Sequence, residues 1–146
     1  MIEVKDYNGW IFGNGNHNYW TEVMAYGRRK YRFYNPIKQN SNHIVALQKQ
    51  STQFKNIPFF SVVVFFGNCE LKEIDFVPER TYLVKSNRIF EVLDQIKSSN
   101  IPAPYIDKYE VLRILKEGVN LGGNVDNQRK HKEDIRNMLG HNRIFD

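Results

Sequence analysis

Two residues near the N-terminus, Glu3 and Lys5, have the types and the spacing that phosphodiester chemistry requires. Side chains alternate between the faces of a strand, so these two share one face, about 7 Å apart along it. A carboxylate placed there can bind Mg²⁺, and the lysine can position an attacking water or stabilise developing negative charge on a phosphate. The competing interpretation is a surface ion pair on an edge strand, which the Glu-x-Lys pattern alone favours. The surrounding elements must decide between a catalytic pair and a surface ion pair.

The N-terminal residues predict strands. The side chains of residues 1–6 alternate in polarity, and none is a turn residue, so we expect a strand. Ile2 and Val4 are expected on the face opposite Glu3 and Lys5, in apolar packing. Asn8-Gly9 predicts a hairpin turn into a second strand at 10–12. The loop that follows has no Lys-Ser/Thr pair and no following helix, so it is not a phosphate-cradling loop. Two more strands are expected at 19–26 and 28–34.

A helix and a buried strand follow. Asn35 is a good N-cap and Pro36 suits the first helical position, so a helix is predicted from there to about Phe54. Residues 59–66 are nearly all apolar and either β-branched or aromatic. A run that is apolar on both faces belongs in the centre of a sheet covered by helices.

The C-terminal part is predicted to be helical. A short strand at 82–84 precedes a helix capped by Ser86, and helices are expected at 106–117 and 125–139, ended by glycines. The domain boundaries that we predict are an α/β domain at 1–97, a linker at 98–104 and a helical tail at 105–146.

Composition limits the class of protein. With 146 residues, 41% of them hydrophobic, the chain is sized for one domain with a real core. It contains no apolar run of membrane-spanning length and no signal-peptide pattern, so no membrane association is expected. Its single cysteine, Cys69, excludes an internal disulfide and a cysteine zinc site, which fits a cytoplasmic protein.

Positive charge is concentrated in the N-terminal half. Residues 1–73 carry nine Lys/Arg and five Asp/Glu, whereas residues 74–146 carry twelve and eleven, within a net charge of +5. In the predicted strand at 28–34, Arg28, Lys30 and Arg32 share one face. Such a strand can lay positive charge along a phosphate backbone, although an ordinary half-exposed hairpin has the same pattern.

The sequence also resembles a known family. The residues Glu3-Val4-Lys5-Asp6-Tyr7-Asn8-Gly9-Trp10-Ile11-Phe12-Gly13, the helix start Asn35-Pro36-Ile37-Lys38-Gln39 and the buried strand at 59–66 resemble the nuclease-related domain (NERD) family. That family is assigned to the PD-(D/E)xK nuclease superfamily, and the resemblance extends over about residues 1–97. It implies an α/β, restriction-endonuclease-like mixed sheet flanked by helices.

The resemblance assigns roles to particular residues. Glu3 matches an acidic metal ligand, Lys5 the catalytic lysine, and Gln39 the glutamine at the start of the helix that faces the site. Gln39 and His43 are spaced i, i+4, so both are expected to approach DNA, unless they belong to a solvated polar stripe. The implied cofactor is Mg²⁺ or Mn²⁺, and the implied activity is hydrolysis of DNA without sequence specificity.

The sequence departs from the family pattern before Glu3. The superfamily's first metal-binding aspartate lies on a preceding strand, and here only Met1 and Ile2 precede Glu3. We therefore expect a fold that lacks the first helix and two strands, with weak metal binding and an open edge along residues 1–6. Three functions remain open: a metal-dependent nuclease, a non-catalytic nucleic-acid-binding module, and a module that pairs through the open edge with another copy or a complementing chain.

Overall fold

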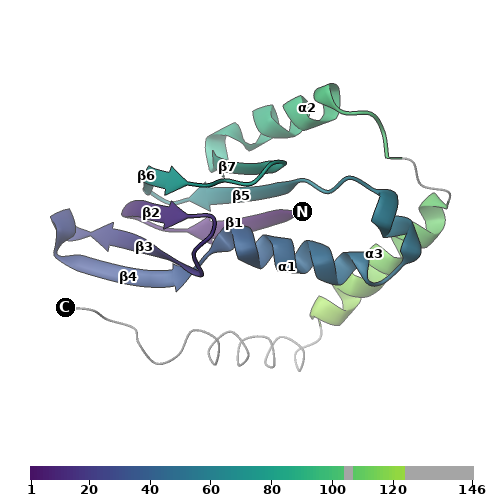
Figure 1. Cartoon of the computed structure of the whole chain (residues 1–146), viewed down its shortest axis with the longest axis horizontal. Coiled ribbons are helices and arrows are strands. Elements are labelled where there is room, and N and C mark those ends of the chain that lie inside the picture. Colours follow the sequence, from purple (N-terminus) through teal and green to yellow (C-terminus); the bar gives the residue numbers. More distant parts are fainter. Residues whose placement is uncertain (104–106, 124–146) are drawn as a thin grey trace.

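The computed structural model describes residues 1–103 and 107–123 and shows a mixed α/β fold (Figure 1). The strands are β1 (Ile2–Asp6), β2 (Trp10–Asn14), β3 (Tyr19–Met24), β4 (Arg29–Tyr34), β5 (Ser61–Phe66), β6 (Glu70–Asp75) and β7 (Thr81–Lys85). The α-helices are α1 (Pro36–Gln48), α2 (Ile89–Ser99) and α3 (Lys108–Gly123). Short 3₁₀ helices occupy Ala25–Gly27 (η1), Thr52–Asn56 (η2) and Ser86–Arg88 (η3).

One sheet is three-stranded and parallel, in the order β1-β5-β7. Its central strand is β5, as the apolar run predicted. Val62 and Val64 face one side of the sheet and Val63 and Phe65 face the other, and all four are buried. Burial on both faces explains why this strand has no alternating polar residue.

The second sheet is four-stranded, in the order β4-β3-β2-β6. The strands predicted at 19–26 and 28–34 are present as the shorter β3 and β4, which form an antiparallel hairpin, whereas β6 pairs in parallel with β2. Strand β6 was not predicted, because its residues are mostly charged and lack a clear apolar alternation.

The hairpin predicted at Asn8-Gly9 is wrong, since β1 and β2 belong to different sheets. Asn8 explains why. Its backbone N–H donates to Glu22 Oε1 at 2.9 Å, and its side-chain Oδ1 accepts from Asn68 N at 3.1 Å. The turn residue is thus bonded to two distant segments, and it carries the chain from one sheet to the other.

The core lies in two parts, on either side of the parallel sheet. On one side, Ile11, Trp20, Ile37, Val63 and Phe65 join α1 and the four-stranded sheet to β5. On the other side, α2 covers the sheet through Ile89, Val92 and Ile96. Figure 1 shows the resulting arrangement, with α1 and α2 on opposite sides of β5.

Helix α1 begins as predicted and ends earlier. Asn35 caps it, with its Oδ1 accepting from Ile37 N at 2.9 Å. The same side chain donates to three carbonyls of the β2–β3 loop, those of Asn14, Gly15 and His17. The helix ends at Gln48 rather than near Phe54, because Ser51 caps a separate 3₁₀ turn that buries Phe54 in the core.

The C-terminal helices also differ from the prediction. Helix α2 starts at Ile89 after a 3₁₀ turn, and Ser86 does not cap it. It continues to Ser99, so the first residues of the predicted linker are helical. Helix α3 continues through Gly118 to Gly123, and the helix predicted at 125–139 lies outside the described residues.

Helix α3 contacts the rest of the molecule through η2. Gln53 Oε1 accepts from Asp107 N at 3.1 Å, its Nε2 donates to Glu110, and Ile114 is buried. Among the described residues, no helix has the length and apolarity needed to cross a membrane.

Candidate active site

The predicted pair of Glu3 and Lys5 is assembled on β1. Lys5 Nζ lies 2.9 Å from Glu3 Oε1 and donates to Gln39 Oε1 at 2.8 Å. The lysine side chain is 17% exposed and the glutamate side chain 13% exposed. A largely buried ammonium held by a carboxylate and an amide oxygen has a fixed position, unlike a solvated surface lysine.

Helix α1 brings Gln39 and His43 to this pair. The cap at Asn35 and the proline at position 36 fix where the helix begins, so residues 39 and 43 fall one turn apart on the side that faces β1. His43 Nδ1 lies 3.8 Å from Glu3 Oε2. The residues Glu3, Lys5, Gln39 and His43, which sequence reasoning placed together, form one cluster.

Asn40 ties the same helix to the parallel sheet. This side chain is fully buried, and its Nδ2 donates to Met1 O at 3.2 Å and to Ser61 Oγ at 2.8 Å. Its Oδ1 is a buried acceptor without a hydrogen bond. The helix is therefore fixed to Met1, immediately before β1, and to the first residue of β5, which sets the height of Gln39 above Lys5.

Tyr7 and Glu22 border the cluster and were not predicted as site residues. Burial, followed by the neighbouring carboxylates of Glu22 and Glu3, raises the pKa of the Tyr7 phenol well above its usual value. Tyr7 packs on Phe33 with ring centroids 4.4 Å apart. The signal for Tyr7 was present in the sequence, since it lies two residues beyond Lys5 and continues the same alternation.

The opposite face of β1 contradicts the prediction. Ile2 and Val4 were expected in apolar packing, but they are 47% and 56% exposed. Their register partners Val62 and Val64 are buried beneath α2, which does not extend over β1. The outer face of β1 is consequently an exposed apolar strip.

The basic residues lie apart from the cluster. Lys30 and Arg32 share a face of β4, opposite Tyr31 and Phe33, and both are exposed. Arg28 precedes the strand rather than lying within it. Arg32 also stacks on Tyr19, with its guanidinium carbon 4.7 Å from the ring centroid. The structure thus keeps two of the three predicted basic residues on one face, opposite Phe33, whose ring packs on Tyr7.

The donor set around Glu3 suits a divalent cation only in part. Mg²⁺ prefers oxygen ligands and usually takes one or two carboxylates together with waters and substrate phosphate. Glu3 offers such a carboxylate beside the imidazole of His43. Within residues 1–103 and 107–123, no group of three or more His, Cys, Asp or Glu side chains could hold a metal ion.

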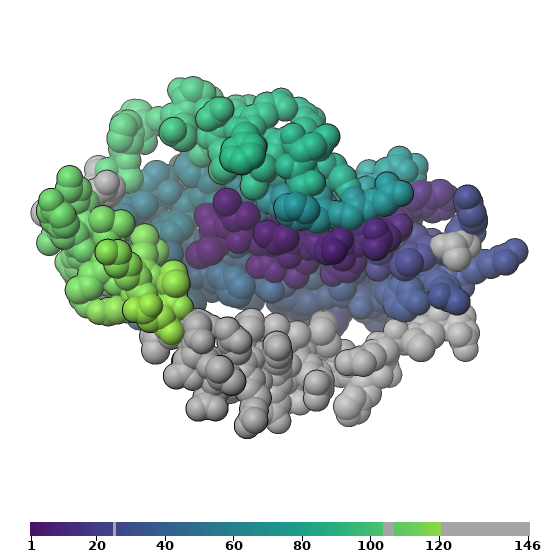
Figure 2. All heavy atoms as spheres, turned by 180° about the vertical axis from the view of Figure 1, so that it is seen from behind, coloured from purple at the N-terminus to yellow at the C-terminus, as the bar shows by residue number. Residues whose placement is uncertain are grey.

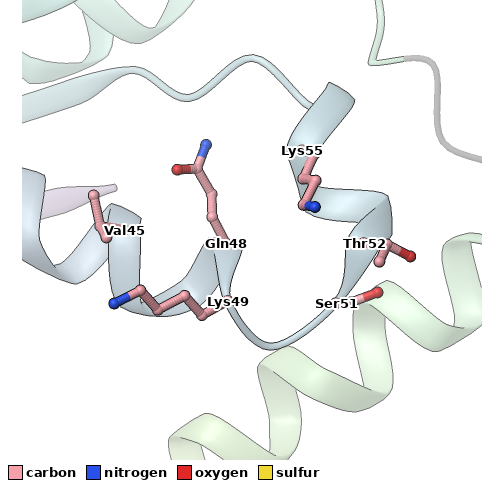
Figure 3. A pocket seen from close by; sticks show the side chains of 6 residues that line it. All are labelled: Val45, Gln48, Lys49, Ser51, Thr52 and Lys55. Atoms are coloured by element: carbon pink, nitrogen blue, oxygen red, sulfur yellow. The ribbon is translucent and has the colours of Figure 1, made fainter.

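An open hollow of about 470 Å³ lies elsewhere, between the end of α1 and η2 (Figure 3). It is lined by Val45, Gln48, Lys49, Ser51, Thr52 and Lys55. The lining contains neither a carboxylate nor an imidazole, so it has no group to bind a divalent cation or to act as a base near neutral pH. The hollow is therefore not an alternative hydrolytic site.

Comparisons with known proteins agree with the predicted resemblance. Residues 1–66 match the sequence model of the nuclease-related domain family, and this match ends with the last residue of β5. An uncharacterized protein of Bacillus anthracis is 29% identical over 94 residues, which cover 64% of this chain and 42% of that protein. The chain thus spans about two fifths of the length of the curated relative that it matches. No solved structure matches the chain.

The matched segment contains every residue of the Glu3 cluster, from β1 through α1. The mixed α/β fold is consistent with the restriction-endonuclease-like architecture, and the family match is consistent with the PD-(D/E)xK superfamily. The similarity to the nuclease-related domain family therefore covers β1 to β5, just under half of the chain.

Proposed function

We propose that this chain is a nucleic-acid-processing module whose chemistry is metal-dependent hydrolysis of DNA phosphodiester bonds at Glu3 and Lys5. The observation that carries the proposal is the convergence of Glu3, Lys5 and Gln39 within hydrogen-bonding distance on one face of β1. The family match over the same residues supports it.

Each residue of the cluster has a distinct role in this proposal. Glu3 is the residue that would hold Mg²⁺ or Mn²⁺, and the bound ion would neutralise phosphate charge and activate water. Lys5 presents its ammonium to the scissile phosphate and stabilises the charge that develops there. Gln39 holds Lys5 in place through its Oε1, so it is a positioning residue.

DNA would be held without sequence specificity. Backbone phosphates supply most of the affinity of non-specific binding, and Lys30 and Arg32 present positive charge along an exposed strand. These residues precede α1 in the chain, and Arg32 lies near the point where β4 leads into the helix that carries Gln39 and His43. We assign them to backbone contacts outside the cluster.

A second ion pair in the chain provides a matched control for the test. Glu70 and Lys72 also have the Glu-x-Lys spacing, and their side chains lie 2.6 Å apart on β6. The substitutions Glu3→Gln and Lys5→Met should each reduce cleavage of plasmid DNA at least ~100-fold in the presence of Mn²⁺ or Mg²⁺. Glu70→Gln and Lys72→Met should leave cleavage unchanged. Equal losses in both pairs, with folding retained, would contradict the assignment.

The alternative is a non-catalytic nucleic-acid-binding module. It is favoured by the incomplete donor set, in which Glu3 is the single carboxylate of the cluster described above. This function predicts DNA binding that weakens steeply with salt, unaffected by Glu3→Gln, and no cleavage with any divalent metal. Cleavage assays and binding assays on the same protein separate the two functions.

A further inference from the structure

Strand β1 has one edge without a strand partner among the residues that the structure describes. It pairs with β5 alone. Met1 O accepts from Val62 N at 2.9 Å, and Tyr7 N donates to Phe66 O at 3.5 Å, so the odd-numbered residues direct their backbone groups toward β5. Because this direction alternates along a strand, the N–H and C=O groups of Ile2, Val4 and Asp6 point to the open edge.

The same three residues present an exposed surface. Ile2 and Val4 are about half exposed, and Phe66, beside Asp6 on β5, is also exposed. Figure 2 shows the N-terminal residues, in purple, at the surface next to the green helix α2. Soluble proteins usually protect an unpaired edge with charge, proline or a bulge, whereas two of the three residues on the outer face of this strand, Ile2 and Val4, are apolar.

The strand is complementary to itself in the antiparallel direction. Reading outward from Val4, the neighbours are Glu3 on one side and Lys5 on the other, followed by Ile2 and Asp6. If Val4 lies opposite Val4 of a second chain, Glu3 of each chain lies opposite Lys5 of the other. Opposite charges directly across a strand pair are stabilising. A register with Lys5 opposite Asp6 would also give two such pairs, but Lys5 directs its backbone groups to β5 and Asp6 directs its own to the open edge, so these two residues cannot lie opposite each other in an antiparallel ladder.

We infer that β1 pairs with β1 of a second copy, antiparallel and centred on Val4, to make one continuous sheet. In this register Val4 exchanges both backbone hydrogen bonds with its counterpart, and Ile2 does the same with Asp6 of the second copy. These are the groups already directed to the open edge. The Glu3–Lys5 pairs across the interface are then non-hydrogen-bonded pairs, whose Cα atoms are closest, about 4.5 Å apart.

The pairing would change the composition of the site, and this step rests on the proposed function. The inner face at the interface would hold Glu3 and Lys5 from both chains in alternating charge. The two Glu3 residues would be diagonal neighbours about 7–8 Å apart, within reach of long side chains. A second copy would thereby bring a second carboxylate to the site, where one chain supplies a single one.

A cysteine scan of β1 tests the register. Val4→Cys places two thiols opposite each other, with Cα atoms about 5.5 Å apart, within the range that a disulfide spans. Ile2→Cys has similar exposure, but its counterpart would lie roughly 14 Å away. Under mild oxidation, Val4→Cys should form a covalent dimer and Ile2→Cys should not. The native Cys69 is buried, and the unmodified chain serves as its control.

Sedimentation of the unmodified chain tests the pairing without any assay of cleavage. The chain should sediment as a dimer at tens of micromolar, and Val4→Asp, which places two carboxylates at the symmetry axis, should weaken association by at least about tenfold. Val45→Asp, at a valine of α1 that is 48% exposed, should leave association unchanged.

Three outcomes would overturn the inference: a monomer at all concentrations tested, crosslinking of Ile2→Cys with equal efficiency, or a stable complex only with another protein. A dimer that cleaves no DNA would leave the pairing in place and remove the proposed function. A monomer that cleaves DNA would do the reverse.

Discussion

Two Glu-x-Lys pairs occur in this chain, and their surroundings separate them. Glu70 and Lys72 are largely exposed on β6, whereas Glu3 and Lys5 are mostly buried beneath α1. An exposed pair contributes little to stability and has no fixed orientation. Lys5 is held from two directions, by Glu3 and by Gln39. The difference between a surface ion pair and a candidate catalytic pair is therefore made by the helix above it.

The free energy of unfolding should fall at alkaline pH, and Tyr7 should account for part of this fall. Its pKa is raised in the folded protein by burial and by Glu22 and Glu3, so the folded state holds this proton more tightly than the unfolded state. The resulting stabilisation is complete below pH ~10, where the unfolded phenol titrates, and is lost as the pH rises above it. Urea unfolding between pH 8 and 11 should show a smaller loss of stability for Tyr7→Phe than for the unmodified chain.

The control for this measurement is Tyr26→Phe, at a tyrosine that is 97% exposed. If Tyr7→Phe loses stability with pH as steeply as the unmodified chain does, the phenol of Tyr7 does not contribute to the alkaline transition.

Removal of the Asn35 side chain should lower the free energy of unfolding more than removal of most other polar side chains. It caps α1 and donates to three loop carbonyls from a fully buried position. Loss of a cap costs about 1 kcal/mol, and each buried group left unpaired costs more, so Asn35→Ala should lower the free energy of unfolding by about 3 kcal/mol. Thermal and urea unfolding will measure this.

Two comparisons define what Asn35 does. Asn35→Asp keeps the cap acceptor but cannot donate to the carbonyls, so it should also be destabilised. Asn42→Ala, at an exposed residue of the same helix, should change stability by less than about 0.5 kcal/mol. A neutral Asn35→Asp would show that the loop contacts contribute nothing.

At the scale of elements, equivalent substitutions on β1 and β5 test whether the two strands differ in burial in solution. Val63→Ala removes methyl groups from a fully buried position and should cost about 2–3 kcal/mol. Val4→Ala makes the same chemical change on the neighbouring strand, where the side chain is more than half exposed, and should cost far less in the monomer. Denaturant unfolding at low protein concentration measures both, and equal costs would mean that Val4 is covered in solution.

The elements that the sequence predicted correctly are those whose signal is local. Residues 62–66 are apolar on both faces, and Asn35-Pro36 combines a cap with a helix-starting proline, so β5 and the start of α1 needed no tertiary information. Each half of the cluster was predictable for the same reason, since one is an i, i+2 pair in a strand and the other an i, i+4 pair in a helix. That Gln39 faces Glu3 and Lys5 was implied only by the family resemblance, because it depends on how α1 packs on β1.

The predictions were wrong where contacts with distant segments determine the local structure or the burial of a residue. Asn8-Gly9 has the local chemistry of a hairpin, but hydrogen bonds to Glu22 and Asn68 direct the chain to another sheet. The polar strand β6 forms because β2 offers it an edge. Ile2 and Val4 were placed in a core because they are apolar, yet α2 is positioned over β5 and β7 and leaves them exposed.

At the scale of the whole molecule, the net charge of +5 gives the proposed DNA binding a measurable signature. A protein that binds backbone phosphates releases counterions, so the logarithm of its affinity falls linearly with the logarithm of salt concentration. Lys30→Ala should weaken binding to all sequences equally and reduce the magnitude of this slope by about 1. Fluorescence anisotropy with two unrelated duplexes across a salt series measures both effects.

The matched control is Lys97→Ala, at an exposed lysine of α2, on the other side of the parallel sheet. If Lys97→Ala reduces the slope as much as Lys30→Ala does, binding follows total charge rather than the face of β4.

The hydrogen bonds of Asn35 bear on where this protein can be extended or labelled. The carbonyls of Asn14, Gly15 and His17 converge on this one side chain, so the β2–β3 connection has a fixed length, and an added residue would pull the start of α1 out of place. The β3–β4 connection, at the other end of β3, has open space at Gly27, where an added Cβ would meet no neighbouring atom within 4 Å; the positive φ of 93° favours keeping this glycine and inserting residues beside it. Of the two connections, the second is the one where a fluorophore or a peptide tag can be inserted without moving Gln39.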